Sequence, residues 1–272
     1  MIEVRLAGAE PYRPDTIADG GSAFGLTVRA ASVRGLQKRY SGGPRQDDLC
    51  LRAHQPTSTL VAAVADGVSG APRSDLAAAL VVRHAAAAAV RQLDRGTADL
   101  DWTDVFDQAA WALVEEHRRD AGDPRAGVED ASGSLATTLL VAAVAAGDEE
   151  EVRVQLAAVG DSPALMLSGG AFERLLGESE GVDGLLGGGV RALPAAARTV
   201  HQRVCTLTPS DVLLLCTDGL ALPLDDGRGD VGRALARELS HPPDIIDFAR
   251  LLDFSRSTYD DDRSLVAIWC GR

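Results

Sequence analysis

Apolar and polar positions follow two different periods along the chain, and the changes of period mark the expected elements. Near residues 48–66 the runs DLCLRAH and TLVAAVAD are separated by the loop QPTS, a pattern typical of two paired strands. The second run is almost continuously apolar, so both of its faces are expected to be buried. Residues 1 to about 25 are polar and contain Gly and Pro, and we expect a lead-in segment there. The first strand is predicted to begin at Leu26, in LTVRAASVRG.

A helical period then replaces the alternation. Ser74 is a suitable N-cap for DLAAALVVRHAAAAAVRQL, which is rich in strong helix formers. The next segment places its apolar residues on one stripe of a second helix: Val105, Phe106, Ala109, Ala110, Leu113 and Val114. The Gly- and Asp-rich stretch AGDPRAGVEDASGS ends this helical region.

Strand-like runs dominate the rest of the chain. They are LATTLLVAAVA, EVRVQLAAVGD, ALMLSGG, RTVHQRVCTL, DVLLLCTD and the final SLVAIWC. Two amphipathic helices are predicted near residues 230–240 and 244–254. The region at about 177–200 has no clean period, so we interpret it as a mobile, flap-like insertion beside a functional site.

The order of these elements predicts the fold class. Short connections between strands favour antiparallel pairing, and helices that come in pairs do not fit the strict alternation of a parallel α/β sheet. We therefore predict an α+β fold, a four-layer αββα sandwich of two antiparallel sheets flanked by helix pairs. No internal repeat or linker is visible, so residues 1–272 are expected to form a single domain.

Composition excludes several classes of protein. The net charge of −13 disfavours a nucleic-acid partner, because phosphate backbones are bound by basic surfaces. No window reaches the roughly 18 uncharged apolar residues of a membrane span, and the N-terminus lacks the apolar region of a secretory signal. Cysteines 50, 205, 216 and 270 show no CxxC spacing. We expect reduced thiols and a cytoplasmic protein without a membrane partner.

Aspartates recur where predicted strands end or begin. Three follow apolar runs directly and precede a small residue, in Asp66-Gly67, Asp161-Ser162 and Asp218-Gly219, and two acidic clusters, Asp47-Asp48 and Asp260-Asp261-Asp262, open strands. A single strand-end aspartate is a common turn residue, so the repetition carries the interpretation. Carboxylates without nearby His or Cys suit Mg²⁺ or Mn²⁺. Two such ions about 3.5–4 Å apart can convert a shared water to a hydroxide that attacks phosphorus.

Other phosphate and acyl chemistries lack their motifs. The sequence contains no GxxxxGK[ST] loop, no GxSxG elbow and no HRD–DFG set. These absences argue against P-loop nucleotide hydrolysis, a serine hydrolase of the α/β type and a protein kinase.

The motifs together resemble a known family. GGPRQD, VAAVADGVSG, GSLATTLLVA, AVGDSPALML, DVLLLCTDGL and DDDRSLVAI resemble the metal-dependent protein serine/threonine phosphatases of type 2C, the PPM family, over residues 25–270. The opening AASVRG…SGGPRQD is most similar to the compact bacterial branch. The resemblance implies the αββα sandwich and Mg²⁺- or Mn²⁺-dependent hydrolysis of phosphoserine and phosphothreonine. It also implies a phosphorylated protein as substrate and an opposing serine/threonine kinase as partner.

The resemblance also implies a role for each acidic residue. Asp66 would bridge two metal ions with help from the Gly67 carbonyl, and Asp218 and Asp261 would complete the shell of the first ion. Asp47 would hold an ion through water. Asp161 would help to hold a third, weaker ion.

Some positions depart from the family pattern and leave alternatives open. Arg45-Gln46-Asp47 stands where many members have Asn-Glu-Asp. Asp48 and Asp262 are rivals of Asp47 and Asp261; Asp261 is preferred because Ser264 then stands where the family usually has threonine. The candidates for binding the substrate phosphate are Arg34, Arg39 and Arg45, and Arg39 is slightly favoured.

These departures also keep a second function open, a catalytically inactive regulatory or phospho-binding module on the same fold. Against it, every predicted metal position keeps its carboxylate.

Overall fold

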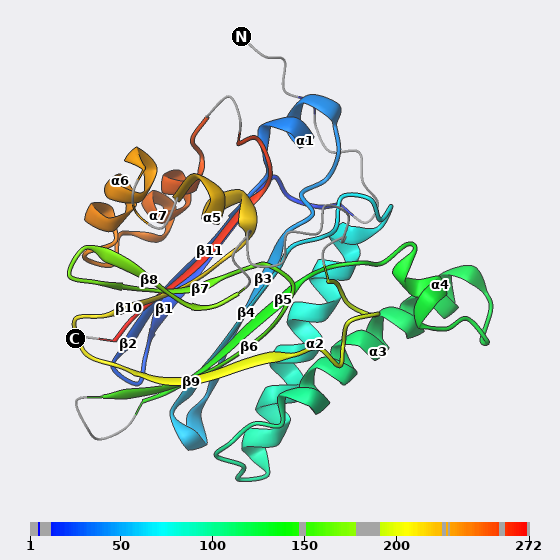
Figure 1. Cartoon of the computed structure of the whole chain (residues 1–272), viewed down its shortest axis with the longest axis horizontal. Coiled ribbons are helices and arrows are strands. Elements are labelled where there is room, and N and C mark those ends of the chain that lie inside the picture. The colour runs from blue at the N-terminus through cyan, green and yellow to red at the C-terminus, as the bar shows by residue number, and fades with distance from the viewer. Residues whose placement is uncertain are drawn as a thin grey trace, which may run out of the picture.

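The protein is described by a computed structural model over residues 5, 12–146, 151–177, 191–224, 227, 229–255 and 259–270 (Figure 1). Its strands form two antiparallel sheets. The six-stranded sheet has the order β1 (Thr16–Ala23), β2 (Leu26–Val33), β11 (Arg263–Trp269), β10 (Val212–Cys216), β7 (Ala164–Ser168) and β8 (Ala171–Leu176). The five-stranded sheet has the order β3 (Asp48–His54), β4 (Thr59–Ala65), β5 (Leu139–Ala145), β6 (Val152–Val159) and β9 (His201–Leu207).

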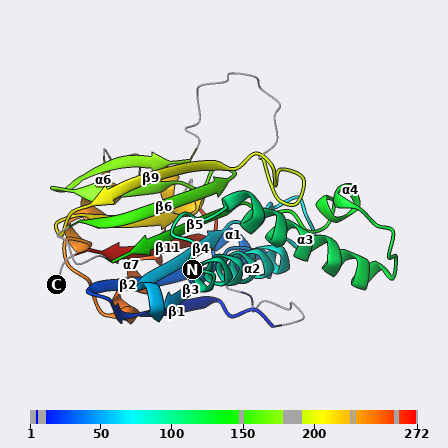
Figure 2. The same ribbon diagram turned by 90° about the horizontal axis from the view of Figure 1, so that it is seen from below.

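Helices cover the outer faces of both sheets, as Figures 1 and 2 show. The long helices α2 (Ser74–Asp94) and α3 (Trp102–Ala121) pack on the five-stranded sheet, and α4 (Val128–Ser132) follows them. The helices α5 (Asp218–Leu224), α6 (Asp230–Glu238) and α7 (Ile245–Leu252) pack on the six-stranded sheet. Two short elements, α1 (Leu36–Ser41) and a 3₁₀ turn η1 (Gln55–Thr57), lie in connections. The predicted αββα sandwich is therefore confirmed.

Three apolar layers hold the four structural layers together. Side chains of both sheets meet in a central core, exemplified by Val64, Leu156 and Val266. A second core lies between the five-stranded sheet and the α2–α3 pair, and a third lies beneath α5 to α7. Alternate residues of β4 enter two of these cores, since Val61 faces the helices and Val64 faces the other sheet. This confirms the expected burial of both faces of that strand.

Helix α2 uses small side chains to lie close to the sheet. Ala78, Ala85 and Ala89 are fully buried in the core that it shares with α3 and the sheet. By length and composition alone this helix is apolar enough to cross a membrane, but most of it is buried inside the sandwich. Its apolar character is therefore explained by packing on two sides.

The sequence did not reveal every element. Residues 1 to about 25 were expected to be a lead-in, which is wrong for β1, a full-length partner of β2 from the pair Thr16↔Val33 to the pair Ala23↔Leu26. The connecting residues Phe24 and Gly25 both have positive φ, as a two-residue hairpin of type I′ requires. Most β1 side chains are exposed or half-buried, so backbone pairing forms the strand without an apolar pattern.

Two smaller predictions also need comment. Ser74 is the first residue of α2 instead of its N-cap, and its hydroxyl accepts a hydrogen bond from the Gln46 side chain at 2.7 Å. The predicted insertion at about 177–200 falls largely on residues 178–190, which lie outside the described residues. The described part, 191–200, consists of turns without a regular helix or strand.

Candidate metal centre

Antiparallel pairing brings the predicted aspartates to one end of the sandwich. Asp66 follows the end of β4, and Asp47 precedes β3, which pairs with β4 through Asp48↔Ala65. In the other sheet Asp218 follows β10, and Asp261 lies just before β11, which pairs with β10 through Cys216↔Leu265. Strand ends of both sheets therefore supply the carboxylates.

The carboxyl groups lie close enough to oppose one another's ionisation. Burial raises the pKa of Asp66 well above its usual value, and the charges of Asp47 and Asp218 raise it further. The side chain of Asp218 adds to this effect through its close approach as well as through its charge. Burial likewise raises the pKa of Asp47, with a further contribution from Asp262. This acidic group carries more negative charge than its surroundings offset.

Asp47 is a buried member of the group, and its carboxylate accepts hydrogen bonds. Its Oδ2 accepts from the Thr217 hydroxyl and the Ser264 hydroxyl, both at 2.8 Å. Its neighbour Asp48 points elsewhere, because its carboxylate forms an ion pair with Arg13 at 3.0 Å. The two acids of this doublet therefore have different surroundings. Of the two, Asp47 is the one whose charge raises the pKa of Asp66.

The second doublet is divided in the same way. Asp262 is 2% exposed, and its two carboxylate oxygens accept from the backbone N–H groups of Gly35 and Gln46, each at 2.6 Å. The Asp261 side chain is 46% exposed and lies beside the other acids. Asp262 thus joins three chain segments, while Asp261 keeps its carboxylate accessible.

The glycines after Asp66 and Asp218 permit a close approach of backbone segments. A Cβ on Gly219 would lie 2.0 Å from the Asp262 carbonyl oxygen. A Cβ on Gly67 would lie 2.7 Å from the Ser74 carbonyl oxygen and 2.8 Å from that of Gln46. The two Asp-Gly motifs are therefore needed to fit the segments of the site together.

Asp161 is half-buried, and its neighbour Ser162 takes part in a hydrogen-bonded bridge to Asp66. The Thr138 hydroxyl accepts from the Asp66 backbone N–H at 3.0 Å and contacts the Ser162 hydroxyl at 3.0 Å. The larger electrostatic effects on Asp66 come from Asp47, Asp218 and Asp261. The role of Asp161 at a third ion stays a prediction.

The three arginines considered as phosphate ligands are all engaged by protein groups. Arg39 forms ion pairs with Asp15 at 2.8 Å and Asp253 at 2.7 Å, which raise the pKa of its guanidinium against the effect of burial. Arg34 is 2% exposed and also pairs with Asp15. Arg45 is 1% exposed and donates to the Ser32 hydroxyl and the Asp47 carbonyl.

Sequence reasoning missed one cation that reaches the acidic group. Lys38, on α1, directs its Nζ to the Gln46 side-chain oxygen and lies 3.5 Å from the Asp261 carboxylate. The signal was present in the sequence, because Lys38 is the single lysine among 27 Lys and Arg residues.

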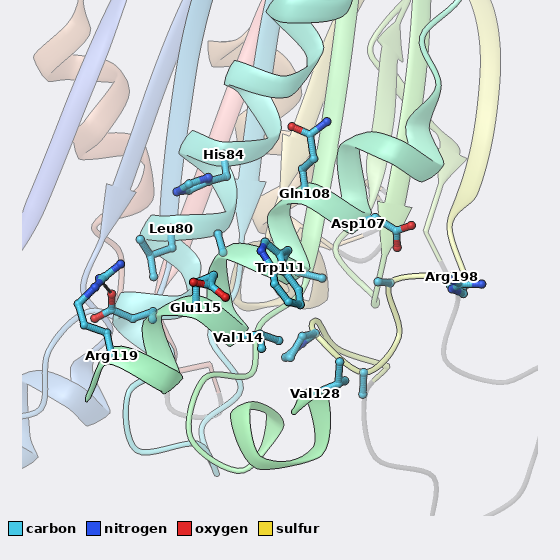
Figure 3. Close-up of a pocket in the computed structure, with 16 residues that line it drawn as sticks. Leu80, His84, Asp107, Gln108, Trp111, Val114, Glu115, Arg119, Val128 and Arg198 are labelled. Atoms are coloured by element: carbon cyan, nitrogen blue, oxygen red, sulfur yellow. Dashed lines mark hydrogen bonds and ion pairs between the residues drawn. The ribbon is translucent and has the colours of Figure 1, made fainter. Parts of the chain in front are cut away.

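A cavity of about 760 Å³ lies elsewhere, lined by residues of α2 and α3, by Val128 and by residues 194–198 (Figure 3). Trp111 lies in its middle, with Glu115 and Arg119 toward one side and Asp107 and Arg198 toward the other. None of the predicted metal ligands lines it. The acidic group is therefore a separate feature at the strand ends.

The acidic group suits hard divalent cations by its chemistry. Every candidate donor is a carboxylate or a backbone carbonyl, and crowding of buried carboxylates is relieved by a bound cation. Within the described part of the chain, no group of three or more Asp, Glu, His or Cys side chains is placed so that it could hold a metal ion as it stands.

Comparisons with known proteins agree with the fold. The catalytic domain of the serine/threonine protein phosphatase PstP, solved with two manganese ions, is 21% identical, with a TM-score of 0.55 over 89% of this chain and 97% of that chain. PppA, a regulatory component of the T6SS in Pseudomonas aeruginosa, is 21% identical, with a TM-score of 0.56 over 92% and 99%. RsbX, solved with magnesium, is 13% identical, with a TM-score of 0.56 over 93% and 98%.

Sequence comparison with curated proteins gives no match. The family comparison, in contrast, matches residues 34–264 to protein phosphatase 2C. This match includes Asp47, Asp66, Asp161, Asp218 and Asp261, and it extends over most of the chain. The protein is a member of the protein phosphatase 2C family.

Proposed function

We propose that this protein is a Mg²⁺- or Mn²⁺-dependent phosphatase that hydrolyses phosphoserine and phosphothreonine in other proteins. One observation carries the proposal: Asp66, Asp218 and Asp261 come together from both sheets with half-buried carboxylates, beside the buried Asp47. The phosphatases PstP and RsbX, solved with manganese and magnesium, support the metal dependence by analogy.

Each residue of the group has a proposed task. Asp66, whose pKa is raised by burial and by the charges of both Asp47 and Asp218, would contact two cations, with help from the Gly67 carbonyl. Asp218 and Asp261 would hold the first cation, and Asp47 would accept a hydrogen bond from a water in the shell of a cation. Asp161 would contribute to a third, weaker site. When bound, the cations supply a hydroxide near neutral pH and neutralise charge on the phosphoryl oxygens.

The test is a phosphatase assay on a phosphothreonine peptide with and without Mn²⁺. We expect activity that requires Mn²⁺ and that Asp66→Asn and Asp218→Asn abolish, because each variant removes a charged ligand but keeps the side-chain shape. Circular dichroism of both variants controls for folding. A purified wild-type protein without metal-dependent turnover would falsify the catalytic proposal.

A regulatory or phospho-binding module is the second candidate. The departure Arg45-Gln46 from the usual family pattern favours it, since Arg45 is buried and bound to protein groups instead of facing a substrate. Calorimetric titration separates the two functions. Tight binding of a phosphopeptide without turnover would support the module, and turnover supports the phosphatase.

The cellular setting follows by analogy only. A protein phosphatase of this kind would oppose a serine/threonine kinase, and we propose a cytoplasmic location from the reduced, mostly inaccessible cysteines. All four are free, and burial raises the pKa of the Cys216 and Cys270 thiols to about 12. Fractionation of the producing cells, followed by detection of the protein, tests the location.

A further inference from the structure

We propose that Lys38 is the residue that binds the substrate phosphoryl group, in place of the arginine expected from the family. The inference rests on the proposed phosphatase function and assigns one further residue to that site. A phosphomonoester is a dianion near neutral pH, and the site that must receive it is built from the carboxylates Asp66, Asp218 and Asp261. A positively charged side chain at the opening of the site offsets that repulsion and orients the phosphoryl oxygens.

Lys38 stands at this opening. Its Nζ lies 3.5 Å from an Asp261 carboxylate oxygen, and the Asp261 side chain is 46% exposed. The distance is long for a charge-assisted hydrogen bond, which is about 2.7–2.9 Å. The ammonium therefore has a loose partner, and a cation held by Asp261 would compete for the same oxygen. An ammonium also carries three donors, so a contact to Gln46 leaves others for an anion.

The surroundings hold Lys38 in place from two sides. The Gln46 side-chain oxygen accepts from its Nζ, and the Gln46 amide donates in turn to the Ser74 hydroxyl at 2.7 Å. Asp262 fixes the backbone of both partners, because it accepts from the N–H of Gln46 and from the N–H of Gly35, which precedes α1. The Lys38 side chain is only 12% exposed. A solvated surface lysine would lack such support.

The nearby arginines are poorly suited to the task. Arg34 and Arg45 are nearly fully buried, and their guanidinium groups donate to backbone carbonyls and to Ser32. Arg39 is shared between two carboxylates at 2.7–2.8 Å, so binding a phosphate would break two ion pairs. Arg263 is 2% exposed and lies over the Phe254 ring. Lys38 has the weaker competing contacts.

The choice of lysine at this position is itself informative. The chain uses arginine at every other cationic position, so a general preference does not explain Lys38. A lysine presents a compact charge, whereas an arginine presents a planar fork that binds carboxylates in pairs. Beside Asp261 an arginine would bind the carboxylate more firmly and would compete with a metal ion. A lysine is therefore the more suitable side chain to bind a phosphate next to a metal ligand.

The experiment compares Lys38→Gln, Lys38→Arg and Arg39→Gln with wild type. Arg237→Gln is the matched control, because it removes one positive charge from a side chain on α6 that is 76% exposed. Three quantities are measured: KM and kcat on a phosphothreonine peptide, binding of inorganic phosphate to the Mg²⁺-loaded protein by calorimetry, and the affinity for Mn²⁺ alone.

We expect Lys38→Gln to weaken phosphate binding and to raise KM by about 10- to 100-fold, the loss of one or two charged hydrogen bonds. Its affinity for Mn²⁺ should stay equal or rise, since the competitor at Asp261 is gone. Lys38→Arg should recover part of the phosphate affinity, and Arg237→Gln should behave as wild type.

Two results would overturn the proposal. In one, Lys38→Gln leaves phosphate affinity unchanged and alters only Mn²⁺ affinity, so the lysine is a counter-ion of Asp261. In the other, Arg39→Gln weakens phosphate binding and Lys38→Gln does not, so the arginine favoured by the sequence holds the substrate. If wild type turns over no substrate, the proposed function fails separately, and phosphate calorimetry still decides the role of Lys38.

Discussion

The acidic group has two halves with the same side chains and different surroundings. In the open half, Asp66, Asp218 and Asp261 keep carboxylates that are partly accessible. In the closed half, Asp47 and Asp262 are 1% and 2% exposed, and hydroxyl or backbone donors bind their oxygens. The contrast teaches that residue type alone does not set the role of an aspartate: Asp262 accepts from donors on distant segments, whereas Asp261 accepts from the N–H of its neighbour Asp262 at 2.9 Å and stays 46% exposed.

The two halves also differ in what offsets the raised pKa values of their carboxyl groups. Donors partly offset the raised pKa of Asp47 and Asp262, although burial still dominates for both. For Asp66 no such donor is among the larger effects on the pKa. The charges of Asp47, Asp218 and Asp261 instead add to the effect of burial and raise it further. Under the proposed function, we therefore expect the open half to gain more from a cation, and the closed half to depend more on its neighbours.

The sharpest way to break this comparison is a substitution in the open half. Asp261→Asn should lower kcat/KM by about 10²- to 10³-fold, because it removes the charge of a proposed ligand, and such interactions contribute several kcal/mol to the transition state. Its stability without metal should be close to that of wild type, since asparagine keeps the side-chain oxygen that accepts from the Asp262 N–H at 2.9 Å. Steady-state kinetics at saturating Mn²⁺ measure the first quantity, and urea unfolding measures the second. A change of less than threefold in kcat/KM would contradict the proposed role of Asp261 as a metal ligand.

The closed half should show the opposite response. Asp262→Ala leaves the N–H groups of Gly35 and Gln46 without their acceptor, which should reduce the free energy of unfolding by about 2–3 kcal/mol. Asp262→Asn keeps one acceptor oxygen and is the matched control, with a smaller loss. Urea unfolding in EDTA gives both values. Equal stability of Asp262→Ala and Asp261→Ala would contradict the division into halves.

Removal of metal should sharpen the comparison further. Mn²⁺ at about 100 times its dissociation constant stabilises a protein by about 2.7 kcal/mol, which corresponds to roughly 5–10 °C in a chain of this size. We expect this rise in Tm for wild type, its loss in Asp66→Asn and a largely preserved rise in Asp262→Asn. Thermal scans with Mn²⁺ and with EDTA test the order. If both variants lose the shift equally, the halves do not differ in metal binding.

The smallest expected effect concerns pH. The raised pKa of Asp66 means that the folded, metal-free protein holds this proton more tightly than the unfolded chain does. Its stability should therefore fall as pH rises above the ordinary value of 3.8 toward the raised value. Asp66→Asn removes this dependence, and the difference between variant and wild type cancels other titrating groups. Urea unfolding in EDTA across a pH series measures it; a difference that grows in favour of wild type with pH contradicts the assignment.

Much of the fold follows from sequence patterns because burial produces them. The continuous run of β4 and the apolar stripe of α3 both report a buried surface, and both elements were predicted. β1 was missed because its backbone pairs with β2 while most of its side chains remain in contact with solvent. The short helix α1 was missed for a related reason, since none of its residues is fully buried.

The residues of the candidate site likewise include some that a sequence pattern reveals and others that only the folded structure reveals. The strand-end aspartates could be found, because an acidic residue after a buried run is unusual in a repeated pattern. The separation of Asp261 from Asp262 could not, because it depends on backbone N–H groups of residues more than 200 positions away. The contact of Lys38 with Gln46 and Asp261 likewise depends on how α1 docks.

Because β11 lies between β2 and β10, the complete acidic group can form only late in folding. Val33 pairs with Arg263 and Thr27 with Trp269, so the six-stranded sheet closes only when distant parts of the chain meet. Such long-range pairings form slowly, because a large loop must close before any contact compensates for its entropy. Asp261 and Asp262 sit directly before that strand. A molecule in which β11 has not yet paired therefore lacks the complete acidic group.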